Sequence, residues 1–292
     1  MTTPLRISRD WVYALGFGAL GLILRLWNLD SPKGKIFDEI YYATNAQSLL
    51  QNGVEIDSKS GLAQFIVHPP TGKWLIASGI KLFGYNEFGW RFAAAVVGSI
   101  SIVLMYFTAK KLFNKQLLSV LAASLISLDG LHLVHSRIAL LDMFLLFFIQ
   151  VAVLAFLHNK YWLSALTLAL ACSVKWSGLY VLIALALYVL VTDFRRHRYL
   201  GADQPIRDML RKNLLYRFLQ FGIFPALIYV GSWFSWFASD KGWDRNFSSN
   251  PLFSLWHYHA EILNFHTKLN DSHPYSANPW SWLIQGRPTS FF

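Results

Sequence analysis

Two adjacent carboxylates, Asp38 and Glu39, stand in the stretch KIFDEIYY shortly after a long apolar run. Neighbouring helical side chains point about 100° apart, so these two acids cannot act as a dyad on one substrate atom. Asp38 also opens a predicted helix that runs to about Gln51 and stops at Gly53. Its carboxylate could therefore cap this helix, accept a proton from a hydroxyl group, or do both.

A stiff His68-Pro69-Pro70 segment leads into a second predicted helix, residues 72–83, which carries Lys73 in its first turn. The helix dipole disfavours a cation at this end, whereas the free amide hydrogens there favour an anion. A bound lipid phosphate would remove the conflict, so His68 and Lys73 are candidate substrate-binding residues. The alternative is a lysine that extends to lipid headgroups, because this helix has one apolar face and suits the membrane interface.

The stretch LDGLHLVHSRIALLDMFLLFF places further ionisable side chains beside an apolar run. Arg137 and Asp142 lie five residues apart, on roughly opposite sides of a helix, so each needs a partner elsewhere. Arg137 could hold a phosphate. Asp142 could orient a substrate hydroxyl, form an ion pair with Lys175, or join a metal site. His132 and His135 are spaced to share a metal, but no third ligand is evident, so we predict no metal site.

The composition indicates what must position these residues. The chain has 292 residues, of which 54% are hydrophobic and 14% charged, against about 25% charged in soluble domains. This balance predicts an all-α, polytopic integral membrane protein. The net charge of +10 is then explained by basic cytoplasmic loops rather than by nucleic-acid binding. Six apolar stretches stand out, at residues 11–29, 92–109, 116–134, 138–157, 162–192 and 218–238.

The fifth apolar stretch is too long for one ordinary span and is interrupted by KWSG, residues 175–178. Lysine and arginine are enriched in cytoplasmic loops, and residues 193–217 carry seven of them. The basic turn at residues 110–115 and the basic N-terminus are cytoplasmic by the same rule. An even number of crossings must then fit before residue 193, which predicts two short spans, 161–174 and 179–192, and seven spans in total.

This topology places the N-terminus in the cytoplasm and all the candidate residues at the outer membrane face. We expect one transmembrane domain over residues 1–238, with a large helical outer loop at 30–91, and an outer-face loop over 239–292. Any chemistry therefore belongs on the outer side, because the cytoplasmic side shows only a basic, solvated loop.

Several motifs occur together and in order: FDEIYY, VHPPTGKW, SRIALLDMFLLFF and SVKWSGLY, followed by the ending HPYSANPWSWLIQGRPTSFF. In this order they resemble the protein O-mannosyltransferases, from about residue 20 to the end. The resemblance implies a GT-C fold and an inverting transfer of mannose, from a polyprenyl-phosphate carrier in the bilayer to Ser or Thr of secreted or membrane proteins. It also implies further spans after residue 292. Because the chain has no room for the large soluble insert of eukaryotic members, a bacterial type in the plasma membrane is favoured.

The resemblance implies roles for individual residues as well. Asp38 and Glu39 match the two catalytic acids, with Asp38 as the base and Glu39 more concerned with positioning. Asp142 matches the acid that follows the motif arginine. Three others match positions near the carrier phosphate or the acceptor: His68, Arg137 and Lys175. The chemistry requires no cofactor. Whether a divalent metal takes part, and whether the chain forms a dimer, are both left open.

Two alternative functions stay open. A related GT-C enzyme could move a sugar or aminosugar to a lipid or glycan acceptor, and Asp38 would serve equally as its base. Only the HPP and SRxxLLD details favour a protein acceptor. A transporter or an inactive membrane subunit belongs to a different class. Transporters tend to show internal repeats and charges near the midplane, whereas this chain shows no repeat and its ionisable groups, Arg25 apart, cluster at one face.

Overall fold

The computed structural model describes residues 8–270, 276–284 and 286–287, and the regular structure within these residues is helical. One isolated antiparallel bridge, between Ile56 and Ala63, accompanies the helices. The predicted all-α class is therefore confirmed. The helices in chain order are α1 (Arg9–Leu26), α2 (Glu39–Asn52), α3 (Thr71–Phe83), α4 (Glu87–Phe113), α5 (Gln116–Leu128), α6 (Gly130–His135), α7 (Leu141–Leu157), α8 (Tyr161–Val174), α9 (Gly178–Tyr199), α10 (Pro205–Lys212), α11 (Leu214–Phe218), a π-helical turn (Leu219–Ile223), α12 (Phe224–Ser232), α13 (Phe234–Ala238), α14 (Pro251–Lys268) and a 3-10 helix (Pro279–Ile284).

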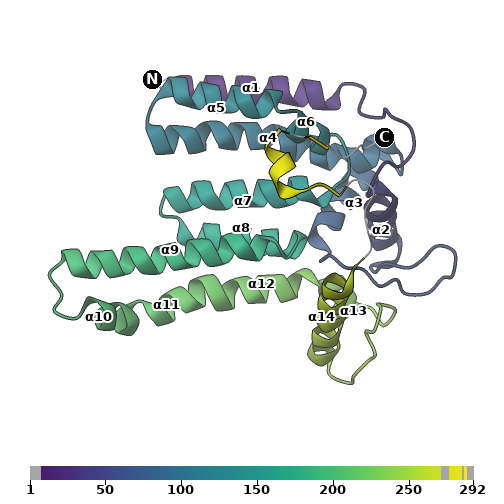
Figure 1. Ribbon diagram of the computed structural model, residues 1–292. Helices are drawn as coiled ribbons and strands as arrows, with labels where there is room; N and C mark the ends of the chain where they lie inside the picture. Colours follow the sequence, from purple (N-terminus) through teal and green to yellow (C-terminus); the bar gives the residue numbers. More distant parts are fainter. Residues whose placement is uncertain (1–7, 271–275, 285, 288–292) are drawn as a thin grey trace, which may run out of the picture.

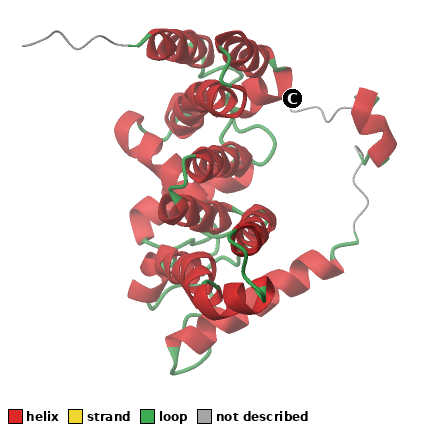
Figure 2. Ribbon diagram, turned by 90° about the vertical axis from the view of Figure 1, so that its left-hand side faces the viewer, coloured by secondary structure: helices red, strands yellow, loops and turns green. Residues whose placement is uncertain are grey.

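The long helices run side by side, and α2 and α14 lie at one end of the bundle that they form (Figure 1). Figure 2 looks along the long helices and shows them nearly parallel. In this bundle α4 packs against α1, α5 and α7, and α8 packs against α7, α9 and α12. Helix α3, from the segment between α1 and α4, packs on this bundle through α4, α7 and α8.

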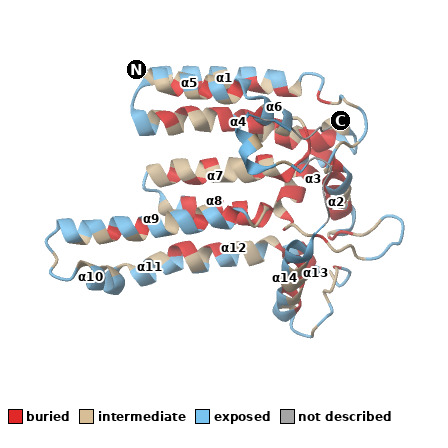
Figure 3. Cartoon of the chain, viewed as in Figure 1, coloured by how far each residue is buried: buried red, intermediate tan, exposed pale blue. Residues whose placement is uncertain are grey.

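Three helical runs of the described chain are long and apolar enough to cross a membrane: α4, α9 and the continuous run Leu214–Ser232. Three shorter helices, α5, α7 and α8, are also apolar. Large parts of α9 and of the run Leu214–Ser232 are exposed, as helices in contact with lipid would be (Figure 3). All six coincide with stretches that the sequence predicts as spans, while the full count of seven stays a prediction.

The structure confirms the predicted break in the fifth apolar stretch. Helix α8 ends at Val174 and α9 begins at Gly178, so Lys175 and Trp176 lie in the turn between two helices. Glycine is needed at this turn, because a Cβ atom on Gly178 would lie 2.7 Å from the backbone nitrogen of Cys172. Contacts between α3 and α8 hold this turn at the end of the bundle where α2 and α3 lie.

Helices α2 and α3 form close to their predicted boundaries. Each ends at a glycine with positive φ, Gly53 at 73° and Gly84 at 88°. Both helices pack against each other, and α3 packs along α4. Their shared core includes Ala43, Ile76, Trp90 and Leu141. This core fixes the start of α2, where the two adjacent acids stand, against the bundle.

A long helix, α14, occupies part of the segment 239–292, where the sequence predicts a loop. Asn250 caps it by accepting a hydrogen bond from the Leu252 N–H at 3.0 Å, and Pro251 fills its first position. The Tyr258 hydroxyl accepts a hydrogen bond from the Ile66 N–H at 3.1 Å. Helix α14 therefore supports the segment that leads into α3.

Candidate active site

The two adjacent acids lie in different surroundings, as the helical geometry predicts. Asp38 is half-buried at the N-cap position of α2, and its side chain makes no cap to that helix. Glu39 is fully buried in the first turn of the same helix, at 0% exposure. The capping alternative for Asp38 is therefore wrong, and of the two acids only Asp38 is accessible to a substrate.

Tyr42, one helical turn after Asp38, lies at the centre of a group of ionisable side chains. Burial, the charges of Asp38 and Asp142, and a hydrogen bond to Asp38 raise the pKa of Tyr42. The His68 ring lies 6.2 Å from the Tyr42 ring, measured between centroids. The fold therefore brings together Asp38, His68 and Asp142, which come from three separate parts of the chain. The protonated phenol of Tyr42 can hold the Asp38 carboxylate by hydrogen bonding.

Asp142 and Lys175 form the ion pair that the sequence allows as one alternative. The Lys175 ammonium donates to both carboxylate oxygens of Asp142, at 2.9 and 3.0 Å. Asp142 stands in the first turn of α7, where the helix dipole favours an acid. The Asp142 side chain is 42% exposed and that of Lys175 is 22% exposed, so a bound ligand can reach both groups.

His68 is neutral at physiological pH in these surroundings. Burial first, and then the charges of Lys175, Lys73 and His266, lower the pKa of His68 to about 3. The imidazole also lies 5.7 Å from the His266 ring, measured between centroids. A neutral imidazole can donate or accept a hydrogen bond to a substrate, but it contributes no positive charge.

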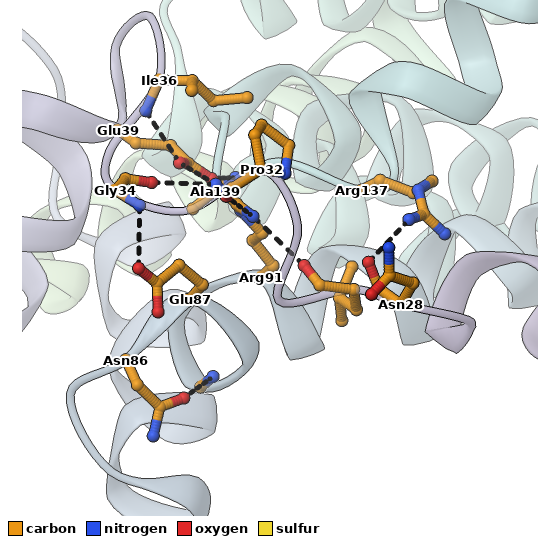
Figure 4. Close-up of polar contacts among 12 residues, drawn as sticks. Asn28, Pro32, Gly34, Ile36, Glu39, Asn86, Glu87, Arg91, Arg137 and Ala139 are labelled. Atoms are coloured by element: carbon orange, nitrogen blue, oxygen red, sulfur yellow. Dashed lines mark hydrogen bonds and ion pairs between the residues drawn. The ribbon is translucent and has the colours of Figure 1, made fainter.

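Glu39 and Arg91 form a buried ion pair that ties α2 to the bundle (Figure 4). Arg91 Nε and Nη2 donate to the two carboxylate oxygens of Glu39, each at 2.9 Å, and both side chains are 0% exposed. Glu39 also accepts hydrogen bonds from the backbone N–H groups of Ile36 and Ala139. The other Arg91 donors reach the carbonyls of Leu29, Pro32 and Gly34.

This network uses every N–H group of the Arg91 guanidinium and leaves Glu39 no face for a substrate. Through it, the first turn of α2 is joined to α4, to the segment after α1 and to the turn before α7. The inclusion of Glu39 among the catalytic residues is thereby corrected. The contacts of Glu39 hold the start of α2 in place, which agrees with the positioning role that the resemblance implies.

Lys73 lies in a buried ion pair instead of facing a ligand. Its ammonium is 2.7 Å from Glu55 Oε1 and donates to the His68 carbonyl at 3.1 Å. Lys73 is 1% exposed and Glu55 is 8% exposed, so neither a lipid phosphate nor the lipid headgroups reach the ammonium. Both alternatives predicted for Lys73 are corrected, because the anion that the helix start requires is supplied by Glu55.

The Arg137 side chain binds the C-terminal end of α1. Its guanidinium donates hydrogen bonds of 2.7–3.2 Å to the backbone carbonyls of Leu24, Arg25, Trp27 and Asn28. A cation satisfies the carbonyls that a helix leaves unpaired at its C-terminus. Arg137 and Asp142 therefore have separate partners, as their spacing predicts, but the partner of Arg137 is a helix end rather than a phosphate.

Sequence reasoning misses Tyr42, Glu55 and Arg91. An arginine beside an apolar run, as in GWRFAAAVV, does signal that a buried partner must exist. Tyr42 is four residues after Asp38, a spacing that places both on one helix face. Glu55 carries no comparable signal. Among the described residues, no group of three or more His, Cys, Asp or Glu side chains could hold a metal ion.

An apolar groove of about 570 Å³ begins beside the α8–α9 turn and runs between α8, α9 and α12. Trp176, which follows Lys175 directly, lines the groove. The groove therefore reaches the α8–α9 turn, which also carries Lys175. Its inner walls include Leu182, Ile183, Phe221, Pro225 and Val230. Such a lining suits a hydrocarbon chain.

Comparisons with known proteins agree with the resemblance. A model of the family described as dolichyl-phosphate-mannose-protein mannosyltransferase matches residues 16–236. A polyprenol-phosphate-mannose–protein mannosyltransferase of Mycolicibacterium smegmatis is 35% identical over 99% of this chain and 65% of its own length. A protein of the same name from Corynebacterium glutamicum is 29% identical over 93% of this chain and 63% of its own length. The chain thus spans less than two thirds of the length of these relatives.

Two solved structures share the fold. The protein O-mannosyltransferase Pmt1-Pmt2 complex of S. cerevisiae, bound to the sugar donor, has a TM-score of 0.65 at 19% identity, over 79% of this chain and 34% of that chain. ArnT from Cupriavidus metallidurans, in the apo state, has a TM-score of 0.61 at 19% identity, over 96% of this chain and 48% of that chain. At this identity the likeness shows the GT-C fold alone.

Proposed function

Because the chain belongs to the dolichyl-phosphate-mannose-protein mannosyltransferase family, we propose that it transfers mannose from a polyprenyl-phosphate-mannose donor to Ser or Thr hydroxyls of proteins. Both bacterial relatives are named for this activity. The observation that carries the proposal is the half-buried Asp38 beside Tyr42, His68 and the Asp142–Lys175 pair. An accessible carboxylate near a cation suits a proton transfer that is coupled to departure of a phosphate.

In the proposed reaction, Asp38 accepts the proton of the acceptor hydroxyl while that oxygen bonds to C1 of mannose. The bond between C1 and the phosphate oxygen breaks on the opposite side, so the configuration at C1 inverts and polyprenyl phosphate leaves with the electron pair. Lys175 stabilises the charge that grows on the leaving phosphate. Asp142 orients the Lys175 ammonium through two hydrogen bonds. Neutral His68 forms a hydrogen bond to a substrate and does not accept the proton.

The proposed donor extends from this site into the apolar groove between α8, α9 and α12. Its phosphate lies at Lys175, and its isoprenoid chain follows the wall that begins at Trp176. An ionised phosphate stays at the polar end of the groove, because a charge is strongly disfavoured among hydrocarbon side chains. The groove and the cation thus support a lipid-linked donor over a soluble sugar nucleotide.

We extend the proposal to the membrane topology. Seven spans are formed by α1, α4, α5 with α6, α7, α8, α9 and the run Leu214–Ser232, with a cytoplasmic N-terminus in a plasma membrane. Residues 1–238 form the transmembrane domain, and residues 239–292 lie with Asp38 at the outer face. The seven basic residues of 193–217 support this orientation. Cysteine accessibility tests it, because a cysteine replacing Ser58 should react with an impermeant reagent from outside and one replacing Ser8 should not.

The proposed mechanism uses no metal, because Lys175 supplies the positive charge at the leaving group. A chelator should therefore leave the transfer rate unchanged, and loss of activity that zinc, manganese or magnesium restores would contradict this. The similar yeast structure is a complex of Pmt1 with Pmt2, which supports a paired assembly here as well. Light scattering of the detergent-solubilised chain would measure it.

The reaction is tested with purified chain in lipid vesicles, a radiolabelled polyprenyl-phosphate-mannose and a Ser/Thr peptide. Asp38→Asn should lower the transfer rate by about 100-fold or more, because it removes the base. Asp30→Asn is the matched control, since within the described part of the chain the Asp30 side chain forms an ion pair with the exposed Lys33 alone. Full activity of Asp38→Asn would refute the base assignment. Transfer to lipid or glycan without transfer to peptide would favour the alternative GT-C reaction.

A further inference from the structure

A second candidate site lies at the opposite end of the bundle from α2, where α10 connects α9 to α11 (Figure 1). We propose that this site binds the headgroup of an anionic phospholipid. A groove of about 900 Å³ is formed there by the end of α9, the turn that follows and α10. It shares no residue with the site around Asp38, so its ligand is independent of the proposed transfer reaction.

Three arginines line the groove: Arg198 from the last turn of α9, and Arg207 and Arg211 from α10. All three are exposed. Arg207 donates to the Gln204 side chain at 3.0 Å, whereas no described residue forms a hydrogen bond or ion pair with the guanidinium of Arg198 or Arg211. Arg207 and Arg211 are also four residues apart on one helix, so their like charges repel. A bound anion would relieve that repulsion.

Cations outside the groove pair with two of the acids of this segment. Residues 193–217 contain seven Lys or Arg and three Asp. Asp193 pairs with Arg217 at 2.8 Å, and Asp208 pairs with Lys212 at 3.3 Å. Two of the three acids are therefore paired with cations that lie outside the groove. Guanidinium groups bind phosphate through paired, directional hydrogen bonds, so a phosphate is the anion that suits three arginines.

Apolar side chains beside the arginines select a lipid over free phosphate. Ile206 and Leu210 line the same groove and are 59% and 46% exposed, and Phe194 lines it from α9. On α10, the apolar pair 206 and 210 thus runs beside the cationic pair 207 and 211. This is the pattern of helices that lie in a membrane interface. Free phosphate would fill only the cationic half of the groove, whereas a phospholipid would fill both halves.

The neighbouring helices determine the depth of α10. Both α9 and the run Leu214–Ser232 are long and apolar enough to cross a membrane. The eight-residue α10 lies in the short connection between them, so it is held where both leave the hydrocarbon region. Phospholipid headgroups occupy this layer, and basic segments next to spans attract anionic lipids there.

Native mass spectrometry of the full chain in detergent, titrated with phosphatidylglycerol or phosphatidylcholine, tests the proposal. We expect the wild type to bind phosphatidylglycerol about tenfold more tightly than phosphatidylcholine. The triple variant Arg198→Gln/Arg207→Gln/Arg211→Gln should bind the two lipids equally. The control variant Arg195→Gln/Arg196→Gln/Lys160→Gln removes the same charge from the same proposed side of the membrane but no residue of the groove and no partner of Asp208. It should keep the preference within about twofold, since none of these three side chains lines the groove.

Three outcomes would overturn the proposal. Equal losses in both triple variants would mean diffuse attraction to a basic loop rather than a site. Equal binding of the two lipids by the wild type would mean no recognition of charge. Displacement of phosphatidylglycerol by equimolar inorganic phosphate would mean an anion site without a lipid. The single variant Arg211→Gln, at an exposed position, provides the same comparison should the triple variant not fold.

Discussion

Replacing Glu39 with glutamine tests whether the Glu39–Arg91 pair builds the active site or takes part in its chemistry. The carboxylate accepts four hydrogen bonds, two on each oxygen, from Arg91 Nε and Ala139 N on one side and from Arg91 Nη2 and Ile36 N on the other. Glu39→Gln keeps the shape of the side chain but replaces one acceptor oxygen by a donor. Whichever way the amide turns, its nitrogen faces two N–H donors and Arg91 loses its counter-charge.

The expected magnitude follows from the burial of this pair. Both side chains are 0% exposed, and Glu39 is the only carboxylate paired with Arg91 among the described residues. Removing one partner of a buried ion pair costs about 3–5 kcal/mol of unfolding free energy, because the remaining charge is uncompensated. At about 2 °C per kcal/mol for a large domain, the melting temperature should fall by about 6–10 °C.

Intrinsic fluorescence of the 12 tryptophans, recorded while the detergent-solubilised chain is heated, measures this fall. Glu87→Gln is the matched control, because Glu87 is an acid of the same region that accepts a hydrogen bond from the Gly34 N–H at 2.8 Å without a buried cation beside it, and losing this bond should cost no more than about 1.5 kcal/mol. Well below its melting temperature, Glu39→Gln should retain measurable transfer, since Asp38 is intact. A variant that melts with the wild type yet has no transfer activity would refute the positioning role.

Three further predictions concern residues around the same site. Lys73→Met leaves Glu55 buried without its cation, so the free energy of unfolding should fall by about 3–5 kcal/mol while the KM for the donor stays unchanged. A raised KM would show that Lys73 binds the donor phosphate. Arg137→Gln should lower the unfolding free energy by about 1–2 kcal/mol through the end of α1, again without a change in donor KM, and an unchanged melting temperature would contradict this. The pKa of His68 is lowered to about 3 in the folded chain, so as the pH falls below about 6.5 the unfolded chain binds a proton that the folded chain does not, and stability is lost over that window. The melting temperature of His68→Gln should therefore fall less between pH 7 and pH 4.5 than that of the wild type. An equal fall in both proteins would show that His68 is not desolvated.

Helix boundaries near the site could be predicted because their signals are local. Gly53 and Gly84 end α2 and α3 at positions where only a residue tolerant of positive φ fits well. The break at residues 175–178 follows from the length of one apolar stretch together with the basic loops around it. Helix α14 could not be predicted in this way. Its core partners Trp233 and Trp236 lie in the turn before α13 and in α13 itself, so its buried face is defined only in the folded chain.

The partners of the buried charges could not be predicted, although the need for partners could. Lys73 pairs with Glu55, which lies 18 residues earlier in the chain. Glu39 pairs with Arg91, which lies 52 residues later. No spacing rule connects residues so far apart, because their proximity depends on how α2, α3 and α4 pack. The pair of Asp142 and Lys175 was within reach of prediction, since each carries a charge next to an apolar stretch that offers it no other partner.

The burial of Glu39 explains why its neighbour is suited to chemistry. Successive helical residues point about 100° apart, so anchoring Glu39 in the interior turns Asp38 toward the accessible side. The same carboxylate accepts the N–H of Ala139, three residues before Asp142, at 2.9 Å. One buried acid therefore fixes both the start of α2, which carries the proposed base, and the start of α7, which orients Lys175. Loosening Glu39 should change the distance between base and cation, and so lower the rate of transfer without removing either group.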